Sequence, residues 1–222
     1  MNVTVYGDSI LKGVLLENGR YRIERCWERS LTSLYGLAIR NASRFGSTLE
    51  KAMSLIRRDA EKKYPDGEVA VLEFGGNDCD YDWAAISAEP DGIYDCKTPP
   101  EKFRRLYREA VELVRGSGRR PVVLTLPPIH SERYLKYICR TGLSAGNILR
   151  WLGDVNHIYR WQAKYSHMAR RIAEETRAEL IDIRRAFITD GRSADELTCV
   201  DGIHPSYAGQ RLIYETISAA LK

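Results

Sequence analysis

The segment VTVYGDSI, residues 3–10, sets the start of the fold. Residues 3–6 are of types that favour β-strands, and Gly7 ends the run. We therefore expect the first strand of the fold here, followed by a turn that carries Asp8 and Ser9. In open α/β sheets ligands bind beyond the carboxyl ends of the strands, so this turn is a candidate part of a functional site.

Short apolar runs like this one recur along the chain and alternate with segments of helical periodicity. Strands are expected at 3–6, 37–42, 69–74, 121–126 and 180–183, with a further strand or hairpin arm at 21–26. Helices are expected at 27–35, 47–63, 100–115, 161–177 and 206–221. Short apolar strands separated by helices indicate a parallel sheet covered on both faces, with right-handed crossovers.

The length of the chain fits one domain. Of its 222 residues, 44% are hydrophobic and 29% are charged, enough for one sizeable core beneath a polar surface. We expect a single domain over residues 1–222. Two stretches, at about 79–98 and 129–160, show little clean periodicity and are expected to be long loop elaborations of that domain. Loops of this length are usually functional or disordered, and the aromatic content of these two favours order.

Composition argues against several classes of protein. The net charge is only +4, and the basic residues come as separated pairs near acidic ones, which argues against a nucleic-acid surface. No apolar run is long enough to insert into a membrane. The N-terminus has neither a basic leader nor an apolar signal core, so we expect a cytoplasmic protein. The five cysteines are scattered without a CxxC pair, which predicts free thiols rather than a disulfide framework or a zinc site.

Residues with useful chemistry follow the expected strands. Ser9 follows the first strand, Gly46 the second and Asn77 the third, while Asp201 and His204 precede the last helix. Because the carboxyl ends of parallel strands share one edge of a sheet, we expect these residues to converge there.

This set of residues is the one that acyl transfer needs. A serine hydroxyl becomes a good nucleophile only when a base takes its proton, and histidine suits that task. A carboxylate on the other ring nitrogen fixes the tautomer. We therefore predict Ser9 as nucleophile, His204 as base and Asp201 as the residue that orients His204. The main-chain N–H groups of Ser9 and Gly46 and the side-chain amide of Asn77 are the predicted donors to an oxyanion.

Plainer interpretations exist for each of these residues taken singly. Ser9 could be an ordinary turn residue, Asp201 could cap the last helix, and Asn77 could satisfy backbone groups in a turn. The Gly75-Gly76 pair lacks the Lys-Ser/Thr of a phosphate loop, and the first turn lacks GxGxxG, so neither nucleotide-binding motif is present.

Other polar residues are expected to have supporting roles. His130, His157 and His167 have no comparable motif around them and are expected to be structural or solvent-facing. Asp8 and Asp78 are expected to hold their loops by hydrogen bonds rather than to do chemistry.

Four short blocks of the sequence together resemble the motifs of a known family, the SGNH hydrolases or GDSL-type esterases and lipases. The blocks are Gly7-Asp8-Ser9-Ile10, residues 41–46, Gly75-Gly76-Asn77-Asp78 and Asp201-Gly202-Ile203-His204-Pro205. The first has isoleucine where the family name has leucine, and the second is the loosest match. The resemblance implies a flavodoxin-like three-layer α/β/α sandwich with a five-stranded parallel sheet. It also implies a mechanism without metal or cofactor and a covalent acyl-serine intermediate.

The function expected from residues and resemblance together is hydrolysis of a carboxylic ester. The partner is then a small-molecule ester, with a small or carbohydrate-linked acyl group, and lysophospholipase and thioesterase activities stay open. The alternative from another class is a non-catalytic binding module on the same fold. Tyr81 and Trp83, in the first long loop, are expected to wall the substrate pocket.

Overall fold

A computed structural model describes residues 2–25, 32, 36–65 and 67–221 of the protein. At its centre is a five-stranded sheet of order β4-β1-β5-β6-β7 in which every neighbouring pair is parallel. The strands are β1 (Asn2–Tyr6), β4 (Ala38–Asn41), β5 (Val69–Leu72), β6 (Arg120–Leu124) and β7 (Glu179–Ile181). This is the five-stranded parallel sheet that the resemblance implied.

The register of the sheet brings apolar residues together on both of its faces. Val3 of β1 pairs with Ile39 of β4 on one side and with Val69 of β5 on the other. Residues of β5 are buried throughout, as expected for a strand covered on both faces.

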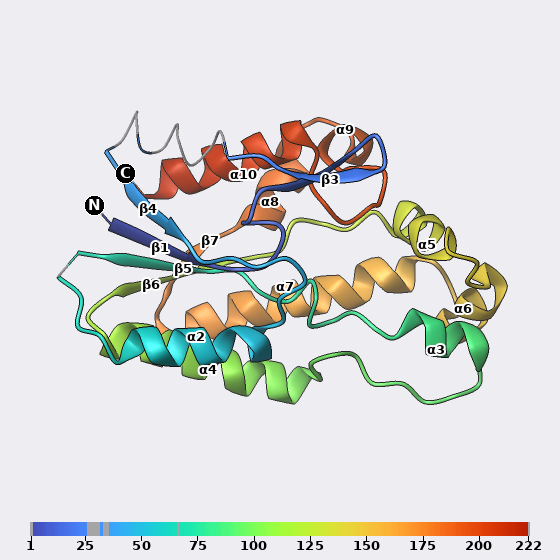
Figure 1. The fold of residues 1–222 in the computed structure, drawn as a ribbon, viewed down its shortest axis with the longest axis horizontal. Coiled ribbons are helices and arrows are strands. Elements are labelled where there is room, and N and C mark those ends of the chain that lie inside the picture. The colour runs from blue at the N-terminus through green and yellow to red at the C-terminus, as the bar shows by residue number, and fades with distance from the viewer. Residues whose placement is uncertain (1, 26–31, 33–35, 66, 222) are drawn as a thin grey trace.

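Helices cover both faces of the sheet and make three layers (Figure 1). One face is covered by α2 (Leu49–Ala60), α4 (Pro100–Gly116) and α7 (Asn156–Thr176). The other face is covered by α8 (Ile183–Thr189) and α10 (Tyr207–Ala220). The apolar core is accordingly split into two clusters, one on each side of the sheet. The predicted three-layer α/β/α architecture is confirmed.

The two stretches expected as loops contain helices. These helices are α3 (Trp83–Ala88), α5 (Ser131–Cys139) and α6 (Ala145–Leu152). In addition, α7 begins at Asn156, earlier than the predicted start at 161. Helices of six to nine residues are shorter than the window over which helical periodicity can be recognised, so their pattern was missed. All three lie beyond the carboxyl ends of the strands, on the right in Figure 1.

A small hairpin lies between the first two strands of the main sheet in chain order. It consists of β2 (Val14–Glu17) and β3 (Arg20–Ile23), paired antiparallel. The hairpin arm predicted at 21–26 is thus found in β3, while its partner β2 was not anticipated. The helix predicted at 27–35 falls, apart from Thr32, outside the described residues. Among the residues described, no helix is long and apolar enough to cross a membrane.

Candidate active site

The turn after β1 presents Ser9 to a cavity at the carboxyl edge of the sheet. The turn is held by main-chain bonds from Lys12 N–H to the Asp8 carbonyl (3.1 Å) and from Val14 N–H to the Ser9 carbonyl (3.0 Å). The Asp8 carboxylate accepts the Ile10 N–H at 2.8 Å. Ser9 is 5% exposed, so its hydroxyl lies inside the cavity rather than on the open surface.

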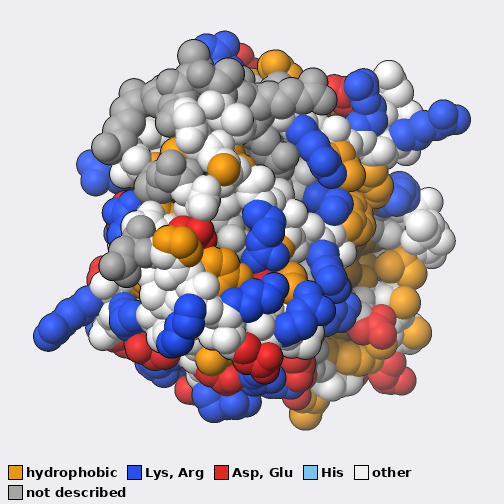
Figure 2. Space-filling view, turned by 60° about the vertical axis from the view of Figure 1, so that its left-hand side comes forward, with side chains coloured by type: hydrophobic (Ala, Val, Ile, Leu, Met, Phe, Trp, Pro, Cys, Tyr) orange, Lys and Arg blue, Asp and Glu red, His pale blue; other side chains and the backbone are white. Residues whose placement is uncertain are grey.

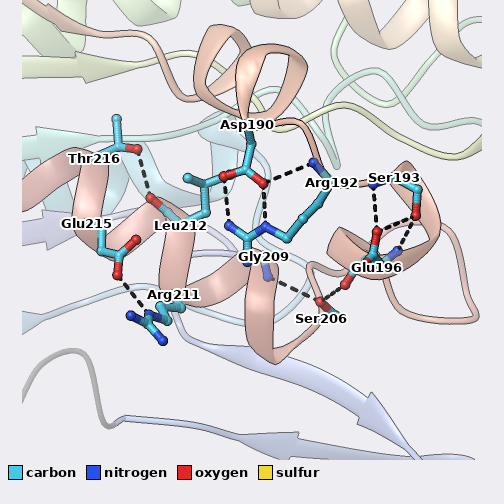
Figure 3. Close-up of polar contacts among 10 residues, drawn as sticks. All are labelled: Asp190, Arg192, Ser193, Glu196, Ser206, Gly209, Arg211, Leu212, Glu215 and Thr216. Carbon is cyan, nitrogen blue, oxygen red and sulfur yellow. Dashed lines mark hydrogen bonds and ion pairs between the residues drawn. The ribbon is translucent and has the colours of Figure 1, made fainter.

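The loop that carries Asp201 and His204 is anchored where it meets α10. Its other neighbour along the chain is the short helix α9 (Ala194–Leu197). The Ser206 hydroxyl donates to the Glu196 carbonyl of α9 and accepts the Gly209 N–H at 3.2 Å, capping α10 (Figure 3). One side chain therefore ties the two helices together beside the loop.

Gly202 brings the same loop against α5. Its φ is +73°, and a Cβ at this position would lie 2.5 Å from both the His130 carbonyl oxygen and the Tyr134 nitrogen. His130 N–H donates to the Gly202 carbonyl at 2.8 Å. Only glycine has both the backbone freedom and the small size needed here, so this residue fixes the loop against the helix.

The structure brings Ser9, His204 and Asp201 into one hydrogen-bonded line. His204 Nε2 is 2.9 Å from Ser9 Oγ, although the two residues are 195 positions apart. His204 Nδ1 is 2.6 Å from Asp201 Oδ2. The other Asp201 oxygen accepts the main-chain N–H groups of Ile203 and His204, each at 3.0 Å. This is the order of groups expected of a nucleophile, a base and an orienting carboxylate.

The surroundings of Asp201 keep it ionised. Burial alone raises the pKa of this fully buried carboxyl, but the hydrogen bond from His204, its charge and the two main-chain donors outweigh burial. The net result is a pKa below the ordinary value for aspartate. An ionised carboxylate on Nδ1 leaves Nε2 free to accept the Ser9 proton.

The three candidate oxyanion donors all face the cavity that contains Ser9 and His204. Ser9, Gly46 and Asn77 line it together. Within the described part of the chain, neither the Ser9 N–H nor the Gly46 N–H donates to another group. Asn77 Nδ2 donates one hydrogen to Asp8 Oδ2 at 2.9 Å, which leaves the second hydrogen of the amide for the cavity.

The cavity has a volume of about 220 Å³ and extends from Ser9 towards α3, α6 and α7. Its walls beyond the polar end are mainly aromatic and aliphatic. They include Tyr81, Trp83, Leu126, Leu152, Ile158 and Trp161. Tyr81 and Trp83, predicted as pocket residues, are therefore among its lining residues.

Three of the aromatic side chains at the cavity have their polar atoms paired within the protein. Asp80 Oδ1 accepts both Trp83 Nε1–H (2.8 Å) and the Tyr134 hydroxyl (2.6 Å). Trp161 Nε1 donates to the Cys79 carbonyl at 2.9 Å. What Trp83, Tyr134 and Trp161 offer to a ligand is therefore mainly ring carbon.

Gln162, another lining residue, is committed in the same way. Its Nε2 donates to the Pro127 carbonyl at 2.8 Å, and its Oε1 accepts Arg184 at 2.7 Å. Both ends of the Gln162 amide are thus hydrogen-bonded within the protein.

Two aromatic side chains pack on the His204 ring, and the sequence did not reveal them. Tyr21 of β3 packs edge-on against it, with the ring centroids 5.2 Å apart, and Phe45 stacks on it, with the centroids 5.9 Å apart. Both are partly exposed, at 43% and 53%, and form the rim of the cavity. His157 also lines the cavity and stacks on Trp161, although it was expected to be structural or solvent-facing. No local pattern marks these three residues, because tertiary packing alone brings them to the site.

Asp8 and Asp78 hold their loops by hydrogen bonds, as expected. Asp78 accepts the Leu49 N–H, the first of α2, at 3.0 Å, while Asp8 accepts Ile10 and Asn77. In the part of the chain that the structure describes, no cluster of three or more His, Cys, Asp or Glu side chains is arranged to hold a metal ion.

A second, open groove lies at the opposite edge of the sheet. Arg115 and Arg120 line it and are paired with Glu112 and Glu179. On the side of the molecule shown in Figure 2, Lys and Arg side chains gather across the middle and Asp and Glu along the lower margin. The groove carries none of the nucleophile, base and orienting groups found at the first cavity.

Comparison with protein families matches residues 5–212 to the GDSL-like lipase/acylhydrolase family. Comparison with curated proteins gives no match.

Solved structures with the same fold cover nearly the whole chain. A candidate SGNH hydrolase from Slackia heliotrinireducens is 20% identical, with a TM-score of 0.63, covering 100% of this chain and 99% of its own. A lipase/acylhydrolase from Enterococcus faecalis is 20% identical, with a TM-score of 0.62 and coverages of 98% and 93%. An acetylxylan esterase from Geobacillus stearothermophilus is 17% identical, with a TM-score of 0.66 and coverages of 99% and 93%. At such identities the likeness concerns the fold.

Proposed function

Because the chain belongs to the GDSL-like lipase/acylhydrolase family, we propose that it hydrolyses carboxylic esters through an acyl-serine intermediate. In this proposal Ser9 is the nucleophile, His204 the general base and Asp201 the residue that orients His204. The observation that carries it is the continuous line from Asp201 Oδ2 through the imidazole to Ser9 Oγ, with separations of 2.6 and 2.9 Å. Both distances are within hydrogen-bonding reach, as proton transfer requires.

The reaction proceeds in two halves. Ser9 Oγ attacks the ester carbonyl carbon while His204 Nε2 takes the hydroxyl proton, and Asp201 stabilises the imidazolium that forms. His204 then gives that proton to the departing alkoxide, so the alcohol leaves and the acyl group stays on Ser9. Water next enters, loses a proton to His204 and attacks the acyl carbon, and the carboxylic acid departs as Ser9 recovers its proton.

The negative oxygen of each tetrahedral intermediate is proposed to lie among the Ser9 N–H, the Gly46 N–H and the Asn77 amide. Support comes from their shared position at the cavity and from the hydrogen of Asn77 that Asp8 leaves unused. Loss of one such donor typically lowers the rate by about 100- to 1000-fold.

The walls of the cavity support an apolar acyl group as its occupant. Its volume of about 220 Å³ exceeds the roughly 150 Å³ of an apolar cavity known to hold benzene, so an acyl chain of several carbons or a phenyl ring fits. The indole and hydroxyl groups of Trp83, Tyr134 and Trp161 are bonded within the protein, which leaves few partners for a sugar hydroxyl. The alcohol must depart before water enters, so we place it at the rim near Tyr21 and Phe45. A carbohydrate-linked alcohol stays a prediction for that rim.

Turnover of a series of p-nitrophenyl esters tests the proposal. The series runs from acetate through butyrate and hexanoate to octanoate, with benzoate as the aromatic member. We expect kcat/KM to rise from acetate to the middle of the series, and a serine-directed phosphonate to label Ser9. A protein that neither turns over any ester nor is labelled at Ser9 would instead be a non-catalytic binding module.

A further inference from the structure

A carboxyl group that the proposed reaction does not use lies directly beneath the nucleophile turn. Glu73 follows Leu72, the last residue of β5, and its N–H continues the sheet by donating to the Tyr6 carbonyl at 3.0 Å. The side chain is 1% exposed and contributes to the inner lining of the cavity. Among the described residues, neither of its carboxyl oxygens has an ordinary donor. A buried ionised carboxylate without donors is costly, so this group needs another explanation.

The polar group that faces Glu73 is Asp8, and Asp8 is well supplied with donors. One oxygen of Asp8 accepts the Ile10 N–H at 2.8 Å, and the other accepts Asn77 Nδ2 at 2.9 Å. The carboxyl groups of Asp8 and Glu73 are close enough for a hydrogen bond between them once one of the two carries a proton. Two carboxyls can share a hydrogen bond only when one of them keeps its proton. Asp8, which receives the other donors, is the ionised member, and Glu73 is the acid.

Glycines make room for this pair. A Cβ on Gly7 would lie 3.2 Å from Glu73 Oε2, and a Cβ on Gly76 would lie 3.3 Å from Asp8 Oδ2. Both distances are tighter than ordinary van der Waals contact. The two glycines therefore let the nucleophile turn and the Asn77 turn close around the two carboxyls.

The charges around Glu73 favour its neutral form. Burial and the neighbouring charge of Asp8 hold the pKa of Glu73 well above its ordinary range, and Asp78 acts in the same direction. The main-chain N–H of Asp8 opposes them with a smaller effect. Tyr107 of α4 faces Glu73 from the helix layer, and its hydroxyl donates to the Leu72 carbonyl at 2.9 Å. Burial raises the pKa of Asp8, while its hydrogen-bond donors and the charge of His204 favour its ionised form. Among these groups no cation faces Glu73.

We propose that Glu73 is a positioning residue: as a neutral acid it donates a hydrogen bond to Asp8, and the Asp8 carboxylate thereby holds the Asn77 amide in place for the oxyanion. The inference rests on the proposed function for the role of Asn77, whereas the neutral state of Glu73 and its effect on Asn77 can be measured without an ester. Positioning errors near 1 Å can cost about 100-fold in rate, so a residue one step removed from the reacting atoms can matter.

Three variants separate this role from simple packing. Glu73→Leu removes the donor, and we expect kcat to fall by about 10- to 100-fold with KM little changed, because the donor acts on the transition state. Glu73→Gln keeps a donating N–H towards Asp8 and should restore most of that kcat. Asp59→Asn is the control: Asp59 is equally buried but pairs with Tyr6 and Arg40 away from the cavity. It should lower stability and leave kcat unchanged.

Two readouts do not depend on activity. If native Glu73 keeps a proton that the unfolded chain releases, the wild-type unfolding free energy must fall, relative to Glu73→Gln, as pH rises from about 5 to about 8. The side-chain amide resonances of Asn77 should shift in Glu73→Leu, return in Glu73→Gln and stay in place in Asp59→Asn.

The outcomes are distinguishable from those for the proposed function. A pH-independent stability difference, or Asn77 resonances that do not respond to Glu73→Leu, would overturn the positioning role even in an active enzyme. Equal loss of kcat in the Leu and Gln variants would do the same. Absence of turnover and of Ser9 labelling in the wild type would overturn the esterase proposal, while the pH slope and the Asn77 resonances would still decide whether Glu73 holds Asn77.

Discussion

The hydroxyl groups of Tyr21 and Tyr137 are 2.6 Å apart and join the β2–β3 hairpin to α5. Burial raises the pKa of Tyr21, as does its hydrogen bond with Tyr137, so the Tyr21 phenol keeps its proton near neutral pH. The centroid of the same Tyr21 ring is 5.2 Å from the ring centroids of both His204 and Phe45. The tyrosine pair thus holds an aromatic rim against the proposed general base.

Removing either hydroxyl is expected to have a modest effect on catalysis. A hydrogen bond of this kind contributes about 1 kcal/mol, so Tyr21→Phe or Tyr137→Phe should lower kcat/KM by no more than about tenfold. Tyr21→Ala, which also removes the ring beside His204, should lower it further. Steady-state kinetics on one short-chain ester measure both effects. Tyr214→Phe, in α10 and outside the lining of the cavity, is the control, and an equal loss in that variant would contradict a local role for the pair.

Ser9→Ala should abolish turnover while leaving the fold intact. The hydroxyl has one side-chain partner, His204, so its loss costs little in stability. The loss of the nucleophile should lower kcat by several orders of magnitude, to a residual rate supported by the oxyanion donors and substrate binding. Kinetics and thermal unfolding of the same preparation provide the test. Wild-type kcat in this variant would mean that the nucleophile is misassigned.

Acidification should slow the enzyme, because a protonated His204 cannot accept the Ser9 proton. Asp201 has a lowered pKa, so it stays ionised over this range and does not itself cause the loss. We expect Asp201→Asn to lower kcat by about 10⁴-fold, because the amide favours the wrong imidazole tautomer. A pH–rate profile of both proteins measures this. A rate that stays constant on acidification would exclude His204 as the base.

Asp201 should also contribute to stability in a pH-dependent way. Its native pKa lies below the unfolded value, so the contribution is present above the ordinary aspartate pKa and is lost as pH falls through the native value. The gap in unfolding free energy between the wild type and Asp201→Asn should therefore be largest near neutral pH and close in strong acid. Denaturant unfolding at several pH values measures the gap, and a gap that widens in acid would contradict the sign.

Trp83→Ala should change which acyl groups are accepted. The Trp83 ring lines the cavity and packs against Tyr81 and Tyr134, so its removal enlarges the pocket. We expect a higher KM for mid-length esters and a preference shifted to longer or bulkier acyl groups. The truncation also costs about 3–5 kcal/mol in stability, so thermal unfolding must accompany the kinetics. Trp83→Phe is the conservative control, and unchanged KM and chain-length preference in Trp83→Ala would remove Trp83 from the acyl site.

The inner strands of the sheet could be predicted because they are short apolar runs. Val69 and its neighbours, buried throughout in β5, are an example. The convergence of Ser9, Gly46 and Asn77 could also be anticipated, because each follows a strand of the parallel sheet. Asp201 and His204 instead lie in the loop before α10. Their catalytic roles stay predictions until the variants above are measured.

What the sequence did not reveal depends on long-range packing. The helix α3 has six residues, too few for a periodic pattern, and takes its place by packing against α6. Tyr21 reaches His204 from the β2–β3 hairpin and Phe45 reaches it from the loop after β4, and no local motif predicts either contact. In the sequence Glu73 is one polar residue within an apolar run. Its proposed positioning role follows only from its location beside Asp8 in the structure.

The separation of 195 positions between Ser9 and His204 also has a consequence for protein synthesis. The ribosome synthesises the turn with Ser9 early and residue 204 only after β7 and α8. For most of translation the nascent chain therefore contains Ser9 without His204. If His204 is the base, as proposed, a chain that terminates before residue 204 lacks the group that deprotonates Ser9. The proposed mechanism therefore predicts that such truncated chains have no esterase activity.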